Sequence, residues 1–98
     1  MKTLIVATAL ATLMALSTNA ASADLCKAMA DTAELMMQAR QRGVPMQVIM
    51  DAAEMKSHKR MVVEAYETPR YITKEVQLRQ VQNFRDRWYM WCFKDKKS

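Results

Sequence analysis

Apolar side chains recur at helical spacing over residues 24–42. At about 100° per residue they fall on one stripe, and polar side chains such as Lys27 and Asp31 lie outside it. Gly43 then fits the left-handed cap that ends many helices, and Pro45 disfavours helical backbone at the residue before it. The pattern therefore predicts a helix over residues 24–42, with a buried stripe of Cys26, Met29, Ala30, Ala33, Met36 and Met37.

A second helix is predicted over residues 45–56, because proline is favoured at the first helical position and Pro45 would occupy it. This segment carries two apolar faces. One face consists of Met46, Ile49, Met50 and Ala53, and the other, nearly opposite, consists of Val48, Ala52 and Met55. The second face is expected either to be buried between other helices or to form an interface with a partner.

Two further helices are predicted in the second half of the chain. The polar run over residues 56–60 predicts a break or bend, followed by a short helix over residues 58–67 that carries Met61, Val62, Ala65 and Tyr66. The final helix is predicted over residues 73–93, with Thr73 as its N-cap and a buried stripe of Val81, Phe84, Trp88 and Cys92. The basic tail after this helix should fray.

The composition supports an all-α fold. The chain contains one glycine and two prolines among 98 residues, and it is rich in residues that favour helices, such as Ala, Met, Gln, Glu, Lys and Arg. No segment alternates apolar and polar residues as an amphipathic strand does. We therefore expect a single domain over residues 24–98 that forms a small three- to four-helix bundle.

Residues 1–23 have the pattern of a cleaved secretory signal peptide. Lys2 supplies the positive charge, residues 4–16 form an apolar stretch, and Ala21-Ser22-Ala23 matches the small-residue cleavage rule. The apolar stretch is shorter than the roughly 20 residues that a membrane-spanning helix requires, so an uncleaved anchor is the less favoured alternative. The expected localisation is the periplasm, or full secretion, after cleavage.

Two cysteines, Cys26 and Cys92, are present in the chain. In an oxidising compartment they would form one intramolecular disulfide. In the chain-entropy model, closing a loop of about 65 residues stabilises a fold by roughly 4 kcal/mol. Both cysteines lie on predicted apolar stripes, one in the first helix and one in the last. The bond would therefore place these two helices side by side, most simply antiparallel.

The sequence gives little indication of catalysis. His58 is the single histidine, and it lies in a basic run without a nucleophile or a supporting carboxylate. Asp51 and Glu54 form an i, i+3 pair, which is typical of a solvated helix face. We therefore expect no catalytic residue, no cofactor and no small-molecule substrate, and we expect that the chain is not an enzyme.

Methionine is abundant, with 10 residues in the chain. Met46 and Met50 share a helix face, and methionine thioethers are ligands for Cu(I). Most of the methionines, however, lie on stripes assigned to the core, where this flexible side chain fills irregular space. A periplasmic copper-binding protein is therefore an alternative function, and no metal ligand is assigned.

The last helix combines aromatic and basic side chains over residues 85–94. Without Lys2 the chain has 14 basic and 10 acidic residues, a net charge of +4. This composition suits an anionic membrane or envelope surface, a protein partner or a homodimer, whereas export argues against nucleic acid. The candidate partner surface consists of Val48, Met55, Tyr89, Trp91 and Phe93.

The predicted mature part contains a combination of features: Cys26 near its start, Arg-Gln-Arg-Gly over 40–43, Ala-Tyr-Glu-Thr-Pro-Arg over 65–70, and Phe84, Tyr89 and Cys92. In this combination the chain resembles a loose group of short exported proteins encoded by phages and prophages of Gram-negative bacteria. These residues are caps, turns and packing positions, so the resemblance carries over no catalytic or binding residue. The group has no settled activity. From the architecture we expect an exported, disulfide-stapled helical interaction protein that binds another envelope macromolecule, and the resemblance suggests modulation of lysis or superinfection as its setting.

Overall fold

The structure, a computed structural model, describes residues 23–97 of the chain. Within this range there are four helices and no β-strand: a first helix over 23–42, α2 (Met46–Ala52), α3 (Lys56–Glu67) and α4 (Lys74–Lys97). The predicted all-α fold is confirmed. None of these helices is both long enough and apolar enough to cross a membrane. The predicted signal peptide lies outside the described residues, apart from Ala23.

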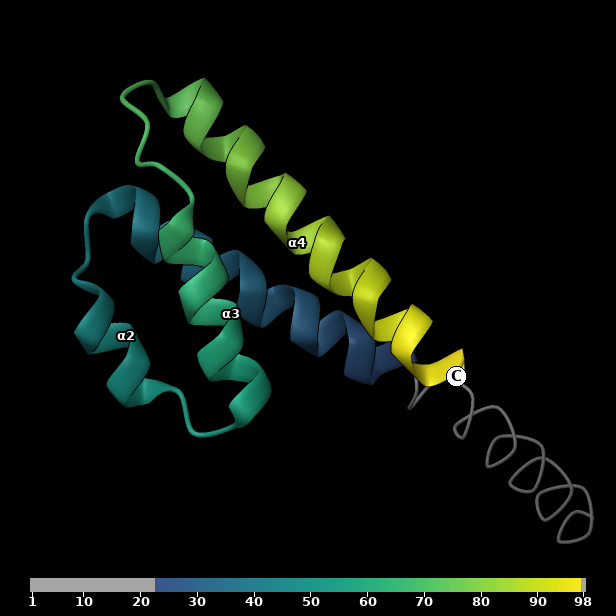
Figure 1. The fold of residues 1–98 in the computed structure, drawn as a ribbon. Helices are drawn as coiled ribbons and strands as arrows, with labels where there is room; N and C mark the ends of the chain where they lie inside the picture. Colours follow the sequence, from purple (N-terminus) through teal and green to yellow (C-terminus); the bar gives the residue numbers. More distant parts are fainter. Residues whose placement is uncertain (1–22, 98) are drawn as a thin grey trace, which may run out of the picture.

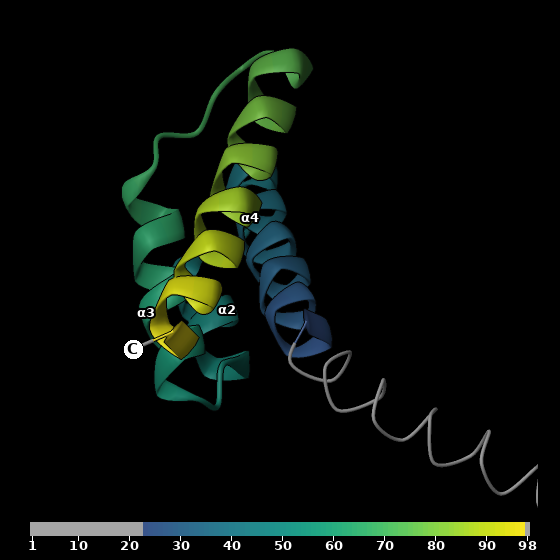
Figure 2. The same cartoon turned by 90° about the vertical axis from the view of Figure 1, so that its right-hand side faces the viewer.

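The first helix and α4 run antiparallel and form the frame of the molecule (Figure 1 and Figure 2). At one end they are joined by the predicted Cys26–Cys92 disulfide, whose two Cα atoms are 5.5 Å apart. At the other end Figure 1 shows them further apart, with the loop between α3 and α4 beside the gap. The helices α2 and α4 lie on opposite sides of the bundle (Figure 1).

A small apolar core lies between the first helix, α3 and α4. It consists of Ala33, Met36, Met37, Ala53, Met61, Val62, Ala65, Val81, Phe84 and Trp88. Alanine at two helical positions, Ala33 and Ala65, lets the helix backbones approach closely, because a methyl group needs little space. The predicted stripes of the first, third and last helices are therefore confirmed, although Met29 and Tyr66 are only partly buried at the edge of the core.

The break between α2 and α3 lies earlier than predicted. α2 ends at Ala52 and the connection consists of residues 53–55, whereas the polar run over residues 56–60 forms the start of α3. Lysine and arginine favour helices, and on an exposed turn their charges stay hydrated. Ala53 adopts extended backbone and packs into the core, so the helix ends where this side chain becomes buried.

The remaining helix ends differ less from the prediction. Pro45 has extended backbone and is the N-cap of α2 rather than its first residue. Thr73 accepts a hydrogen bond from the Val76 amide at 3.4 Å, as an N-cap does. α4 continues to Lys97, whereas the sequence predicts fraying of the residues after position 93.

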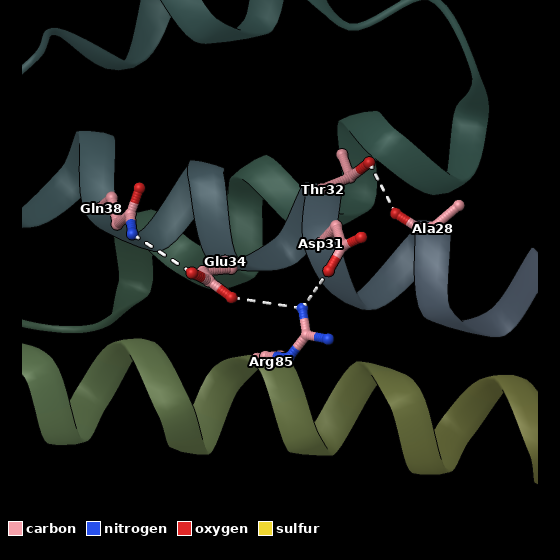
Figure 3. A network of polar contacts seen from close by, with 6 residues as sticks. All are labelled: Ala28, Asp31, Thr32, Glu34, Gln38 and Arg85. Carbon is pink, nitrogen blue, oxygen red and sulfur yellow. Dashed lines mark hydrogen bonds and ion pairs between the residues drawn. The ribbon is translucent and has the colours of Figure 1, made fainter. Parts of the chain in front are cut away.

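An ion pair crosses between the first helix and α4 near their middle (Figure 3). Arg85 donates hydrogen bonds to Asp31 and, at 3.2 Å, to Glu34. The hydrogen bond to Asp31 raises the pKa of Arg85, so the guanidinium stays charged. Because all three side chains remain partly in solvent, this pair is expected to contribute about 1 kcal/mol or less. It fixes the register of the two helices more than it stabilises them.

The two links between the first helix and α4 should differ strongly in their contribution to stability. Replacing both Cys26 and Cys92 by serine should lower the free energy of unfolding by about 4 kcal/mol, because the loop between them is no longer closed. Arg85→Gln, which removes the ion pair but leaves the loop closed, should lower it by about 1 kcal/mol or less. Urea unfolding followed by circular dichroism measures both effects, and equal effects would contradict this ranking.

Candidate functional site

The C-terminus of the first helix is closed by a Schellman cap. The Gly43 amide donates to the Arg40 carbonyl at 3.1 Å, and the Val44 amide donates to the Ala39 carbonyl at 3.0 Å. Gly43 has φ +85°, a left-handed conformation that favours glycine. The predicted cap is therefore confirmed, and it leaves the last turn of this helix beside the loop that connects α3 and α4.

Gln41 lies in this last turn and binds that loop with both ends of its amide group. It is 3% exposed, and its Nε2 donates to the Pro69 carbonyl at 2.9 Å. Its Oε1 accepts a hydrogen bond from the Tyr71 amide at 2.8 Å. A buried amide of this kind costs free energy unless both ends are paired, so the two bonds hold the loop in one position.

Two arginines add to this contact. Arg40 donates from Nε to the Thr68 carbonyl at 2.9 Å, and its guanidinium lies 5.2 Å from the centre of the Tyr66 ring. Arg70 donates from Nε to the Gln41 carbonyl at 2.9 Å. Its guanidinium also covers Gly43, where an added Cβ would lie 2.9 Å from Arg70 Cζ. The loop is therefore held from both its start and its middle.

Tyr66 ties the end of α3 to the same cap. Its hydroxyl donates to the Val44 carbonyl at 2.6 Å. Burial raises the pKa of Tyr66, and the positive charge of Arg40 opposes this shift. The neutral hydroxyl is therefore kept as a donor. We call the hydrogen bonds made by Arg40, Gln41, Tyr66 and Arg70 the loop anchor.

The loop anchor presents an isoleucine to solvent. Ile72 is 98% exposed, directly after the Tyr71 amide that Gln41 binds. In the second turn of α4, Leu78 is 60% exposed, and residues 74–80 include no buried position. Ile72 has the highest exposure of the large apolar side chains in the described part of the chain, and a contiguous exposed apolar patch is typical of an interaction site.

Two surface cavities adjoin these apolar side chains. One, of about 350 Å³, lies between the first helix and α4 and is lined by Gln38, Gln41, Arg42, Lys74, Gln77, Leu78 and Val81. The other, of about 390 Å³, is lined by Arg70, Tyr71, Ile72 and Gln77. They share the lining residue Gln77, so they lie next to each other. We call Ile72, Leu78 and the three cations around them, Arg42, Arg70 and Lys74, the Ile72 surface.

The charge of the Ile72 surface is positive. Within residues 23–97, Arg42, Arg70 and Lys74 pair with no carboxylate, and Arg70 instead donates to a backbone carbonyl. The nearest acidic residue in the sequence of α4, Glu75, is paired with Arg79 at 3.6 Å. A partner with acidic groups around an apolar side chain would therefore match this surface.

The structure does not bring the predicted partner residues together. Val48 and Met55 belong to the second face of the α2 segment, which is exposed, so burial of this face between helices is wrong. α2 is too short and too peripheral for both of its faces to be covered. Tyr89 and Phe93 form an edge-to-face pair on α4 with ring centres 5.0 Å apart, and Figure 1 shows α4 on the opposite side of the bundle from α2. Trp91 packs against Trp88 of the core.

The residues considered for catalysis or metal binding are scattered. Met36, Met37 and Met61 are buried in the core, and Met46 is exposed on α2 while Met50 is partly buried. Within residues 23–97 there is no group of three or more His, Cys, Asp or Glu side chains that could hold a metal ion. His58 lies in the first turn of α3, partly exposed.

Sequence reasoning missed Gln41 and Ile72. Gln41 lies one helical turn after Met37, so a polar residue occupies the next position of the apolar stripe. That position could have indicated a buried polar side chain. The exposure of Ile72 had no such signal, because it depends on how the loop is held. Comparison of the chain with protein-family models, with curated proteins and with solved structures finds no match.

Gln41→Ala tests the loop anchor. The substitution leaves the Pro69 carbonyl and the Tyr71 amide without their partner, so the free energy of unfolding should fall by about 2–4 kcal/mol. Gln38→Ala is the matched control on the same helix, because among residues 23–97 the Gln38 side chain bonds only to Glu34, at 3.4 Å. The control should change stability by about 0.5 kcal/mol or less. If the two variants unfold at the same urea concentration, the anchor does not hold the loop.

Proposed function

We propose that this chain is an exported, disulfide-stapled helical interaction protein that binds another macromolecule through the Ile72 surface. The observation that carries the proposal is the 98% exposure of Ile72 on a loop that is held by the loop anchor. Burying such a side chain in a contact stabilises a complex by about 1.5–3 kcal/mol. Because the loop is already ordered, little conformational entropy is lost on binding.

The surroundings of Ile72 support a binding role. Binding energy in interfaces is concentrated in a few central side chains that fill pockets, with less important contacts around them. Ile72 and Leu78 are suitable central residues, and the adjoining cavities can accept side chains of a partner. The unpaired cations Arg42, Arg70 and Lys74 would form the charged rim. This arrangement favours a protein partner over a purely ionic surface.

Export rests on the sequence pattern of residues 1–23 and on the compartment that a disulfide requires. A Cys26–Cys92 bond is compatible with an oxidising compartment such as the periplasm. The resemblance to exported phage and prophage proteins suggests a partner at the cell envelope, with lysis or superinfection as the affected process. The copper-binding alternative rests on the Met46–Met50 pair, since Met36, Met37 and Met61 are buried in the core.

Site-specific photocrosslinking tests the Ile72 surface. A photoreactive amino acid at position 72 should give a discrete adduct with one envelope component when the protein is expressed with its signal sequence. The same amino acid at position 35 is the matched control, since Leu35 is 64% exposed on the first helix, outside the Ile72 surface. Adducts of equal yield from both positions, or none from position 72, would contradict the proposal.

Once the partner is purified, Ile72→Asp should weaken its binding by about 30-fold, the effect of losing an interface residue worth about 2 kcal/mol. Leu35→Asp should leave the affinity unchanged within a factor of about 2. Both side chains are exposed in the free protein, so neither substitution should lower the melting temperature. Isothermal titration calorimetry measures the affinity. Equal affinities of the two variants for the partner would show that Ile72 does not lie in the interface.

A further inference from the structure

A second recess lies between α3 and α4, in the half of the molecule that contains the disulfide. It has a volume of about 190 Å³ and is lined by Arg60, Glu64, Arg87, Trp88 and Trp91. None of these residues belongs to the Ile72 surface. We call this recess the tryptophan cleft.

Trp88, one of the residues that line this cleft, has an unpaired hydrogen-bond donor. The side chain is 3% exposed, and its Nε1 is buried without an acceptor among the described residues. An indole nitrogen only donates, and leaving such a donor unpaired costs about 1–3 kcal/mol. A phenylalanine would fill most of the same space without this cost. An acceptor supplied by a bound molecule would pair this donor.

The other lining residues favour an anionic acceptor. Arg60 is paired with Glu64 at 3.2 Å, whereas Arg87 has no carboxylate partner in the described part of the chain. The Arg87 guanidinium instead lies 5.2 Å from the centre of the Phe84 ring. The two arginines and Glu64 leave the cleft with one net positive charge. Arginine is the side chain best suited to bind oxygen anions through several hydrogen bonds.

Trp91 gives the cleft an apolar wall. Its ring lies edge-to-face against Trp88 with the ring centres 5.1 Å apart, and the side chain is partly exposed. Lys94 follows Trp91 by one turn of α4, and Lys56 precedes Arg60 by one turn of α3, so further exposed cations lie along the same helix faces. A ligand with an anionic group and a less polar part would bind the arginines with the first and pack against Trp91 with the second.

We propose that the tryptophan cleft binds a phosphate ester. One phosphate oxygen accepts a hydrogen bond from Trp88 Nε1, and Arg60 and Arg87 pair with its charge. A phosphate offers oxygens in several directions, which suits donors that come from two different helices. The neighbouring glycerol or sugar carbons lie against Trp91. The ester is supplied either by an anionic phospholipid headgroup or by a soluble phosphorylated molecule, and the site is independent of the proposed function.

The Trp88 indole proton reports directly on this contact. Because Nε1 is covered in the free protein, binding must move the atoms that cover it and bring an oxygen to the nitrogen. In proton–nitrogen NMR spectra of the oxidised protein, the Trp88 indole signal should move downfield and saturate as glycerol 3-phosphate is added. Trp91→Phe identifies which of the two indole signals belongs to Trp88.

Two probes distinguish the sources of the ester. Saturation with glycerol 3-phosphate indicates a soluble ligand. Binding to phosphatidylglycerol vesicles, without binding to phosphatidylcholine vesicles or to glycerol 3-phosphate, indicates a lipid headgroup. Either result supports the proposal. A small, non-saturating shift that sodium acetate reproduces at the same ionic strength would mean an adventitious ion only and would overturn it.

Variants locate the binding site. Trp88→Phe and Arg87→Gln should each weaken binding of the responding probe by about 10- to 100-fold, as expected for a hydrogen bond to a charged group. Arg79→Gln is the control: it removes one charge from the same helix, and Arg79 is paired with Glu75 away from the cleft. If Trp88→Phe does not fold, comparing the affinities of Arg87→Gln and Arg79→Gln for the probe still tests the proposal. Equal affinities for these two arginine variants would overturn the proposal.

Discussion

The Cys26–Cys92 disulfide holds the first helix against α4, and the remaining contacts of the bundle depend on this pairing. The core between the helices is small, and several of its positions are alanine, so apolar burial alone gives limited stability. Joining the two long helices near the ends of the chain reduces the number of unfolded conformations. α3 then completes the core by packing Met61, Val62 and Ala65 between the joined helices.

The opposite end of the same pair is held without a covalent bond. There the first helix ends in a glycine cap, and Gln41 and its neighbours bind the loop that leads into α4. No residue over positions 74–80 of α4 is buried, and Leu78 and Ile72 are exposed. The molecule therefore has one end fixed by a disulfide and one end fixed by hydrogen bonds, and its most exposed apolar side chain lies at the second end.

Much of the fold could be predicted from the sequence, because helical periodicity reports directly on which side chains share a face. The stripes containing Met37, Val62 and Phe84 are buried as that periodicity indicates, and the glycine cap and disulfide follow from local rules. The α2–α3 break and the exposed second face of α2 depend on which helices lie nearby, and periodicity carries no such information. The candidate site was harder to predict from the sequence, because it forms where segments 40–44 and 66–71, which are distant in the sequence, come into contact.

The central claim is that the α3–α4 loop is ordered and presents Ile72 in one conformation. Amide hydrogen exchange of the Tyr71 N–H tests it most directly, because this amide bonds to buried Gln41 Oε1 while it lies in a surface loop. If opening the anchor costs about 2.8 kcal/mol, this amide exchanges about 100-fold more slowly than an unprotected one. Exchange at the unprotected rate would show that the loop is mobile and would contradict the account.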